Sequence, residues 1–149
     1  MGTSRHPQPA RLAAIAQAIP PACHEAYPEA QAIYLFGSWV EGAPRPDSDC
    51  DVALLLPPIE ARRAGVLALS PLRVELERQL GLEVDLVNLR LASTVLAKEV
   101  VTRGDRIHAA DLAAAEAFEA LTLSLYQELN LERAEVLRDF ERTGRAFGA

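Results

Sequence analysis

Residues Tyr34 to Leu56 read YLFGSWVEGAPRPDSDCDVALLL. One apolar run ends at Gly37, and a second apolar run closes the segment, with Asp49 and Asp51 at its start. A carboxylate taken out of water either costs on the order of several kcal/mol or shifts its pKa until it is neutral. Two carboxylates on the same side of a strand also repel each other, since strand residues two apart share a face. This arrangement predicts a positively charged ligand beside the two aspartates.

The apolar periodicity predicts alternating strands and helices. Strands are expected at residues 32–36, 51–56 and 82–89, with a short edge strand at 106–108. Helices are expected at residues 10–19, 38–42, 70–80, 93–102 and 111–142. Pro20 and Pro21 should stop the first helix, and Ser70 should cap the third. The pattern indicates an α/β or α+β domain.

Length and composition exclude several classes of protein. The 149 residues suit a single compact domain, residues 1–149, with Met1 to Pro9 as a frayed end. No apolar run approaches the roughly 20 residues of a membrane helix, and the start lacks a signal peptide, so a soluble cytoplasmic protein without membrane contact is expected. The net charge of −6 disfavours direct binding of nucleic acid and suits a basic protein partner.

The cysteines and histidines carry no chemistry that the sequence reveals. Two cysteines, Cys23 and Cys50, are too few for a disulfide framework. Three histidines are scattered without ligand spacing, so no zinc site is expected, and each is interpreted as an ordinary surface or loop residue. They are His6, His24 and His108.

The last expected helix, residues 111–142, is longer than a small sheet can cover. Its distal half is therefore a candidate surface for a partner. The alternative is that it folds back onto the domain, and the sequence leaves both open.

Three carboxylates and a glycine turn together indicate a site that binds a metal ion and a phosphate. Asp85 lies among aliphatic residues in the strand expected at 82–89, and if that strand neighbours the one at 51–56, Asp49, Asp51 and Asp85 converge. Three carboxylates at one place are the hard oxygen ligands that Mg²⁺ prefers. Gly37 and Ser38 follow a strand and open a helix, where the backbone can approach a phosphate and N–H groups favour an anion.

Each part alone has an ordinary interpretation. A Gly-Ser pair is common in turns, Asp-x-Asp after a proline loop can be a solvated turn, and Asp85 can be a partnered core acid. In combination, FGS at 36–38, ten residues, DCDV at 49–52 and a later strand acid resemble the signature of the nucleotidyltransferase superfamily of DNA polymerase β. Within the superfamily the chain resembles the minimal nucleotidyltransferase (MNT) domains, especially antitoxins of the MntA type, which pair with HEPN-domain toxins.

The resemblance implies a nucleotidyltransferase fold, with a small mixed sheet flanked by helices and a long C-terminal helix. It implies transfer of AMP from ATP to a tyrosine hydroxyl of the HEPN toxin, which neutralises the toxin's RNase activity. Asp49, Asp51 and Asp85 would be both catalytic and metal-binding, with two Mg²⁺ ions held mainly by the first two. Gly37 and Ser38 would bind the nucleotide.

Two residues depart from the family's pattern: Glu128 stands in the tail where relatives tend to have aspartate, and Glu41 bears on nucleotide binding. Glu41 stands before Gly42 where relatives usually have arginine, so Arg45, Arg90 or Lys98 would have to supply the counter-charge. A non-catalytic antitoxin that masks its toxin, and a free-standing enzyme that modifies a small molecule, remain alternatives. Trp39 is either a core residue or a platform for a base.

Overall fold

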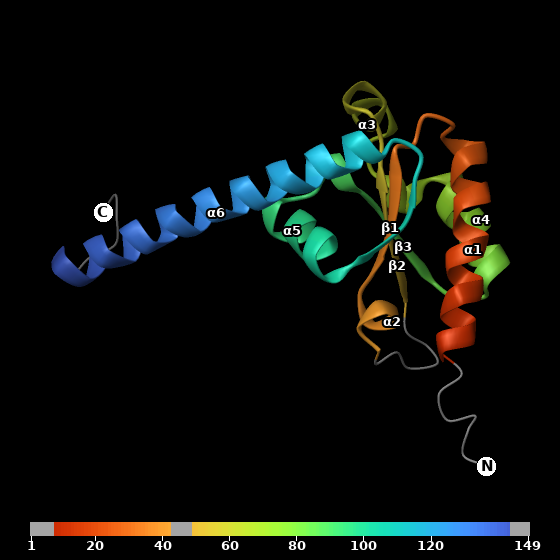
Figure 1. Ribbon diagram of the computed structural model, residues 1–149, viewed down its shortest axis with the longest axis horizontal. Helices are drawn as coiled ribbons and strands as arrows, with labels where there is room; N and C mark the ends of the chain where they lie inside the picture. Colours follow the sequence, from red (N-terminus) through yellow and green to blue (C-terminus); the bar gives the residue numbers. More distant parts are fainter. Residues whose placement is uncertain (1–7, 43–48, 144–149) are drawn as a thin grey trace, which may run out of the picture.

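A computed structural model describes residues 8–42 and 49–143, with side chains from Ala10 onward. Its frame is a four-stranded sheet in the order β3-β2-β1-β4 (Figure 1). Strand β1 is antiparallel to both β2 and β4, whereas β2 and β3 are parallel, so the predicted mixed sheet is confirmed. The strands are β1 Ala32–Phe36, β2 Cys50–Leu55, β3 Val84–Asn88 and β4 Asp105–Ala109.

Six α-helices and two short 3₁₀ turns are described around the sheet. Ser70 caps α4 as predicted, because its hydroxyl accepts a hydrogen bond from the Arg73 N–H. Helix α3 is not among the predicted helices: it begins at Pro58, directly after the strand, and proline is well tolerated in a first helical turn. The helices are α1 Gln8–Ala26, α2 Ser38–Glu41, α3 Pro58–Ala64, α4 Pro71–Leu80, α5 Thr94–Arg103 and α6 Leu112–Thr143, and the turns are Leu67–Leu69 and Leu89–Leu91.

Helix α1 corrects the prediction that Pro20 and Pro21 end it, since it continues to Ala26. Two prolines remove two backbone donors, yet Ile19 and Cys23 on either side of them are fully buried. Packing of this apolar stripe on the sheet outweighs the local preference of proline. The frayed segment predicted at residues 1–9 lies almost wholly outside the described residues.

The sheet has a core on each face. Residues that alternate along the strands, such as Ile33, Val52 and Leu54, pack with α1 and α4 in the larger core. The intervening residues, such as Tyr34 and Ala53, pack with α5 and the first turns of α6 in the smaller one. Figure 1 shows α1 and α4 on one side of the strands and α5 with the start of α6 on the other.

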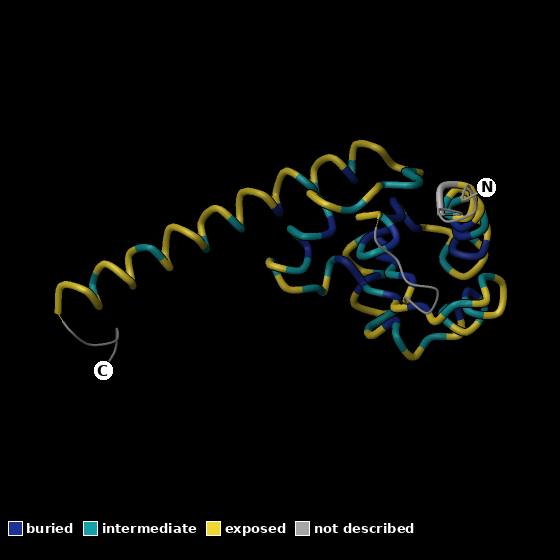
Figure 2. Tube along the Cα trace, turned by 90° about the horizontal axis from the view of Figure 1, so that it is seen from below, coloured by how far each residue is buried: buried dark blue, intermediate teal, exposed yellow. Residues whose placement is uncertain are grey.

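Helix α6 is the most extended element of the molecule. Its 32 residues span about 48 Å at 1.5 Å per residue. Its first half packs on α5, and its second half projects from the domain, as Figures 1 and 2 show. The distal half therefore does not fold back. Within the described residues, no helix combines the length and the apolar character needed to cross a bilayer.

A partly buried polar contact holds α6 to the sheet. The Tyr34 hydroxyl of β1 donates to Glu119 of α6 at 2.7 Å, and Arg106 of β4 donates to the same carboxylate oxygen at 2.6 Å. Burial and then the Glu119 hydrogen bond raise the pKa of Tyr34, so its phenol stays protonated and remains a donor. Hydrogen bonds to charged groups are stronger than neutral ones. This contact sets where α6 leaves the sheet.

We expect Tyr34→Phe to lower the free energy of unfolding by about 1 to 2 kcal/mol, because it removes one hydrogen bond to a charged group. Urea denaturation measures the change. Tyr126→Phe is the matched control, since it keeps the ring that Lys98 contacts at 4.9 Å from the centroid and should cost less than about 0.5 kcal/mol. Equal losses in the two variants would contradict the role given to the Tyr34 hydroxyl.

Candidate active site

The register of two parallel strands places two of the predicted acids side by side. Asp51 of β2 is the direct partner of Asp85 of β3, so the two side chains share one face of the sheet. Asp49 lies two residues before Asp51, just ahead of β2, and is exposed to solvent, as is Asp85. The acids thus stand at the edge of the sheet where β2 begins. The side chains of β2 alternate between the two faces of the sheet, so Cys50 and Val52 point into the larger core and Asp51 points to the other face.

These acids carry negative charge that the described residues do not neutralise. Burial, then the charge of Asp85 and then that of Asp49, raise the pKa of Asp51 to about 6. The ion pairs among the described residues do not include any of the three aspartates. An uncompensated carboxylate cluster of this kind is typical of functional sites that receive a cation.

Gly37 lies directly against this cluster. It joins β1 to α2 with φ of +81°, and a Cβ placed on it would lie 2.0 Å from Asp51 Oδ2. Only glycine allows both the backbone conformation and the approach. Strand β1 pairs with β2 so that Phe36 faces Asp51, which brings Gly37 and Ser38 to the acids. The predicted neighbours are therefore adjacent, although α2 is a single turn and its helix dipole is small.

The three aspartates have the oxygen ligands that Mg²⁺ prefers, but their arrangement does not hold the ion by itself. Carboxylate oxygens without a basic partner are the donors this ion prefers. In residues 8–42 and 49–143, however, no three acidic, histidine or cysteine side chains are gathered closely enough to hold a metal ion by themselves. Magnesium is commonly held by one or two carboxylates together with substrate phosphates and water. The arrangement therefore fits an ion that arrives with a triphosphate.

Two of the cations predicted to balance Glu41 are engaged elsewhere. Arg90 donates to the Leu56 carbonyl beyond the far end of β2 and to Gln31 Oε1 at 2.7 Å. Lys98 lies over the ring of Tyr126 on α6. Neither approaches the acids, because both belong to contacts at the other end of the sheet or on α6. The third candidate, Arg45, lies outside the described residues.

The structure reveals a different cation beside α2. The Arg11 guanidinium of α1 lies 5.5 Å from the centroid of the Trp39 ring. Trp39 is only 4% exposed and belongs to the larger core, which favours the core interpretation of this residue over a platform for a base. Sequence reasoning missed Arg11 because nothing in the sequence connects it with α2.

The buried thiol between the aspartates is chemically silent. Burial, with a smaller contribution from Asp51, raises the pKa of Cys50 to about 12. Burial alone raises the pKa of Cys23 to about 12. Both thiols stay protonated at neutral pH, and a protonated thiol is a poor nucleophile. The chemistry of this site therefore belongs to its carboxylates.

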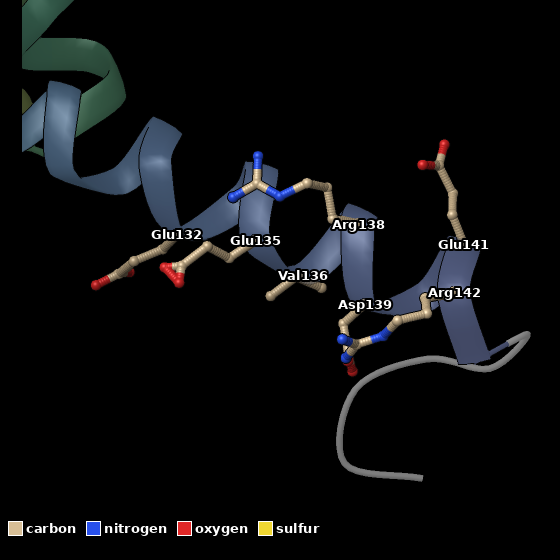
Figure 3. Close-up of a pocket in the computed structure, with 7 residues that line it drawn as sticks. All are labelled: Glu132, Glu135, Val136, Arg138, Asp139, Glu141 and Arg142. Atoms are coloured by element: carbon tan, nitrogen blue, oxygen red, sulfur yellow. The ribbon is translucent and has the colours of Figure 1, made fainter.

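Hollows on other parts of the surface do not compete with this site. Figure 3 shows seven residues between Glu132 and Arg142 that border one of them, all on the distal part of α6. One side of a single helix has no opposing wall and cannot enclose a substrate. A second groove lies between α3, α5 and α6, beside Arg90 and Phe118. It contains none of the three aspartates.

The family follows from a comparison with known sequences. The model of the polymerase beta nucleotidyltransferase family matches residues 21–112, which include the Gly37 turn and all three aspartates. The chain belongs to the polymerase beta nucleotidyltransferase family. This nucleotidyltransferase is 39% identical over 112 residues to the protein adenylyltransferase MntA of Shewanella oneidensis, covering 75% of this chain and 77% of MntA.

Solved structures agree with the family assignment. A chain of a toxin–antitoxin crystal structure with AMP-PNP matches with a TM-score of 0.66 and 34% identity, over 85% of this chain and 98% of that one. A chain from the complex of the tri-AMPylated HEPN toxin of S. oneidensis with its MNT antitoxin matches with a TM-score of 0.61 and 32% identity, over 85% of this chain and 96% of that one. The predicted resemblance to MntA-type nucleotidyltransferases is confirmed.

We expect Asp51→Asn to stabilise this nucleotidyltransferase above pH 6. The pKa of Asp51 is raised on folding from 3.8 to about 6, so its favourable contribution is complete below about pH 4 and is lost as the pH rises through 6. Allowing for partial exposure of the side chain, the asparagine should gain about 1 to 2 kcal/mol at pH 8 and almost nothing at pH 4. Urea denaturation at both pH values measures this.

Glu116→Gln is the control for this experiment, because it removes an exposed carboxylate of α6 far from the cluster. A gain at pH 8 in both variants would indicate a general effect of net charge instead of local repulsion.

We expect Gly37→Ala to abolish binding of AMP-PNP with Mg²⁺. The new methyl group forces the Asp51 carboxylate to rotate away, since no other atom can move as easily. The unusual φ also costs about 1 to 3 kcal/mol of stability. Gly42→Ala is the matched control: its φ is +83° and its Cβ would meet no atom of the described residues within 4 Å, so it should lose about 1 kcal/mol and keep binding. Calorimetric titration and urea denaturation report both effects, and equal binding in the two variants would refute the argument.

Proposed function

We propose that this nucleotidyltransferase is the antitoxin of a toxin–antitoxin pair and transfers AMP from Mg-ATP to a HEPN-domain toxin. The observation that carries the proposal is the Asp51–Asp85 pair in register beside the Gly37 turn, in a chain 39% identical to a protein adenylyltransferase. The AMP-PNP in one similar structure and the AMPylated toxin in another support the nucleotide and the acceptor class. We place this reaction in the cytoplasm, where its substrate ATP is available.

Each residue of the candidate site has its own role in the proposed reaction. Gly37 and Ser38 hold the β and γ phosphates through backbone and hydroxyl donors, which leaves the α-phosphorus in line for attack. Asp49 and Asp51 would hold two Mg²⁺ ions, with help from Asp85. Bound there, the metal would supply positive charge that offsets the charge on the triphosphate.

Asp85 accepts the proton of the attacking hydroxyl as the oxygen bonds to the α-phosphorus and pyrophosphate leaves. The hydroxyl comes from a tyrosine of the toxin. Asp85 and Asp49 are exposed, so a second protein chain can reach them. Exposure of the acids favours an acceptor carried by another protein over a small molecule, which would need a pocket of its own.

Masking of the toxin without catalysis is the second candidate. Glu41 at the exposed end of α2 favours it, since a negative charge near the Gly37 turn weakens the attraction of a triphosphate. In that case the aspartates would be dispensable for neutralisation.

One experiment distinguishes AMP transfer to the toxin from masking of the toxin. The full chain is incubated with ATP, Mg²⁺ and the toxin encoded beside it, and the toxin's intact mass and RNase activity are followed. We expect whole AMP units to be added and RNase activity to be lost, and both effects to vanish in Asp49→Ala/Asp51→Ala and when EDTA removes the metal. Asp85→Asn should slow transfer about 10²- to 10⁴-fold, the usual worth of a general base.

Glu25→Ala/Glu29→Ala is the matched control, because it removes two exposed carboxylates near the opposite end of the sheet and should leave transfer unchanged. Neutralisation that survives the Asp49/Asp51 change without any gain in mass would establish masking. Transfer of AMP to small hydroxyl compounds but not to the toxin would establish the third alternative.

A further inference from the structure

Two histidines that lie 84 positions apart in the sequence meet in the structure. His24 lies in the last turn of α1 and His108 lies in the edge strand β4. Their Nε2 atoms are 2.9 Å apart, and their rings meet edge to face with centroids 4.8 Å apart at 82°. The sequence interpretation of both as ordinary surface residues is therefore wrong. It failed because α1 was expected to stop at Pro20, before it could carry His24 over β4.

The contact joins the metal-binding atoms of both rings. In a hydrogen bond between neutral imidazoles, one Nε2 carries the proton and the other presents its lone pair. If the donor ring moves its proton from Nε2 to Nδ1, both Nε2 lone pairs become available on atoms 2.9 Å apart, with no proton gained or lost. Both rings are half-buried, so their positions are restrained while solvent and ions still reach them.

The spacing matches two neighbouring positions around a metal ion. Nitrogen ligands bind such ions at about 2.1 Å, and two of them 2.9 Å apart subtend an angle of about 90° at the ion. That is the angle between adjacent ligands in tetragonal Cu²⁺ and Ni²⁺ sites. Tetrahedral Zn²⁺ needs a separation of about 3.4 Å, which the rings reach by opening a few tenths of an ångström.

The histidine pair is separate from the carboxylate cluster. His108 pairs with Ile33 near the start of β1, whereas Asp51 pairs with Phe36 at its end, about 10 Å along the strand. Ile33 points into the core under α1, and Asp51 points to the opposite face of the sheet. Metal at one site therefore does not share ligands with the other.

We propose that His24 and His108 form a two-histidine binding site for one divalent transition-metal ion, bound in the order Cu²⁺ before Ni²⁺ and Zn²⁺. No further histidine, cysteine or acid completes a three-ligand group in the described part of the chain, so water fills the remaining positions. The ion links the end of α1 to the edge strand β4. It stabilises the folded chain and not the nucleotide site, since it binds far from the aspartates.

The test uses the full-length chain without an affinity tag, titrated with CuCl₂, NiCl₂ or ZnCl₂ by calorimetry and thermal unfolding. We expect one ion per chain and a Tm increase of about 5 °C with Cu²⁺ at 100 times its Kd. His24→Gln and His108→Gln should each weaken binding at least 10-fold. His6→Gln is the matched control and should bind like the wild type, and Asp49→Ala/Asp51→Ala should keep the ion held by the two histidines.

Electron paramagnetic resonance of the Cu²⁺ complex provides a second measurement that does not depend on how stable the variants are. Nitrogen couplings from two imidazoles in the wild-type complex support the proposal. Absence of binding overturns it, as does binding that survives both histidine changes or is lost with the aspartates. In that event the pair is a hydrogen bond between α1 and β4 and nothing more.

Discussion

Two carboxylates held in register on neighbouring parallel strands are the constraint on which the rest of this structure depends. Asp51 and Asp85 repel each other, and their strands cannot relieve the repulsion by slipping. A shift of one residue would turn Val52 and Leu54 out of the larger core and Ala53 and Leu55 out of the smaller one, and neither set fits the other core. The apolar core thus enforces an electrostatic strain that a bound cation would relieve. This is how a small domain keeps an attractive site for Mg²⁺ before the ion arrives.

The turn at Gly37 lies beside the same pair of carboxylates. Antiparallel pairing of β1 with β2 brings the end of one strand to the start of the other, so the turn and the acids lie together without any contribution from a second domain. The absent side chain of Gly37 leaves the space that the Asp51 carboxylate occupies. With the site at one edge of the sheet, α6 extends away from it, held along its first half by packing on α5 and by the Glu119 contact.

Several local signals were overruled by packing. Pro20 and Pro21 are strong helix breakers, but the apolar residues around them are buried on the sheet and α1 continues. That continuation brought together His24 and His108, which no spacing in the sequence connects. Arg90 was a reasonable partner for a phosphate by charge alone. The structure uses it to bind carbonyl groups at the far end of β2, because an arginine there satisfies buried acceptors.

The sequence by itself determined the chemistry of this protein: a glycine turn and three carboxylates, at intervals that local strand periodicity makes interpretable. It also determined the strands and most helices, since alternation and capping act over a few residues. Only the tertiary structure decided which of these elements are neighbours. The register of Asp51 with Asp85, the direction of α6 and the meeting of the two histidines all depend on contacts between distant segments, and the free energy of those contacts comes from burial shared across the whole core.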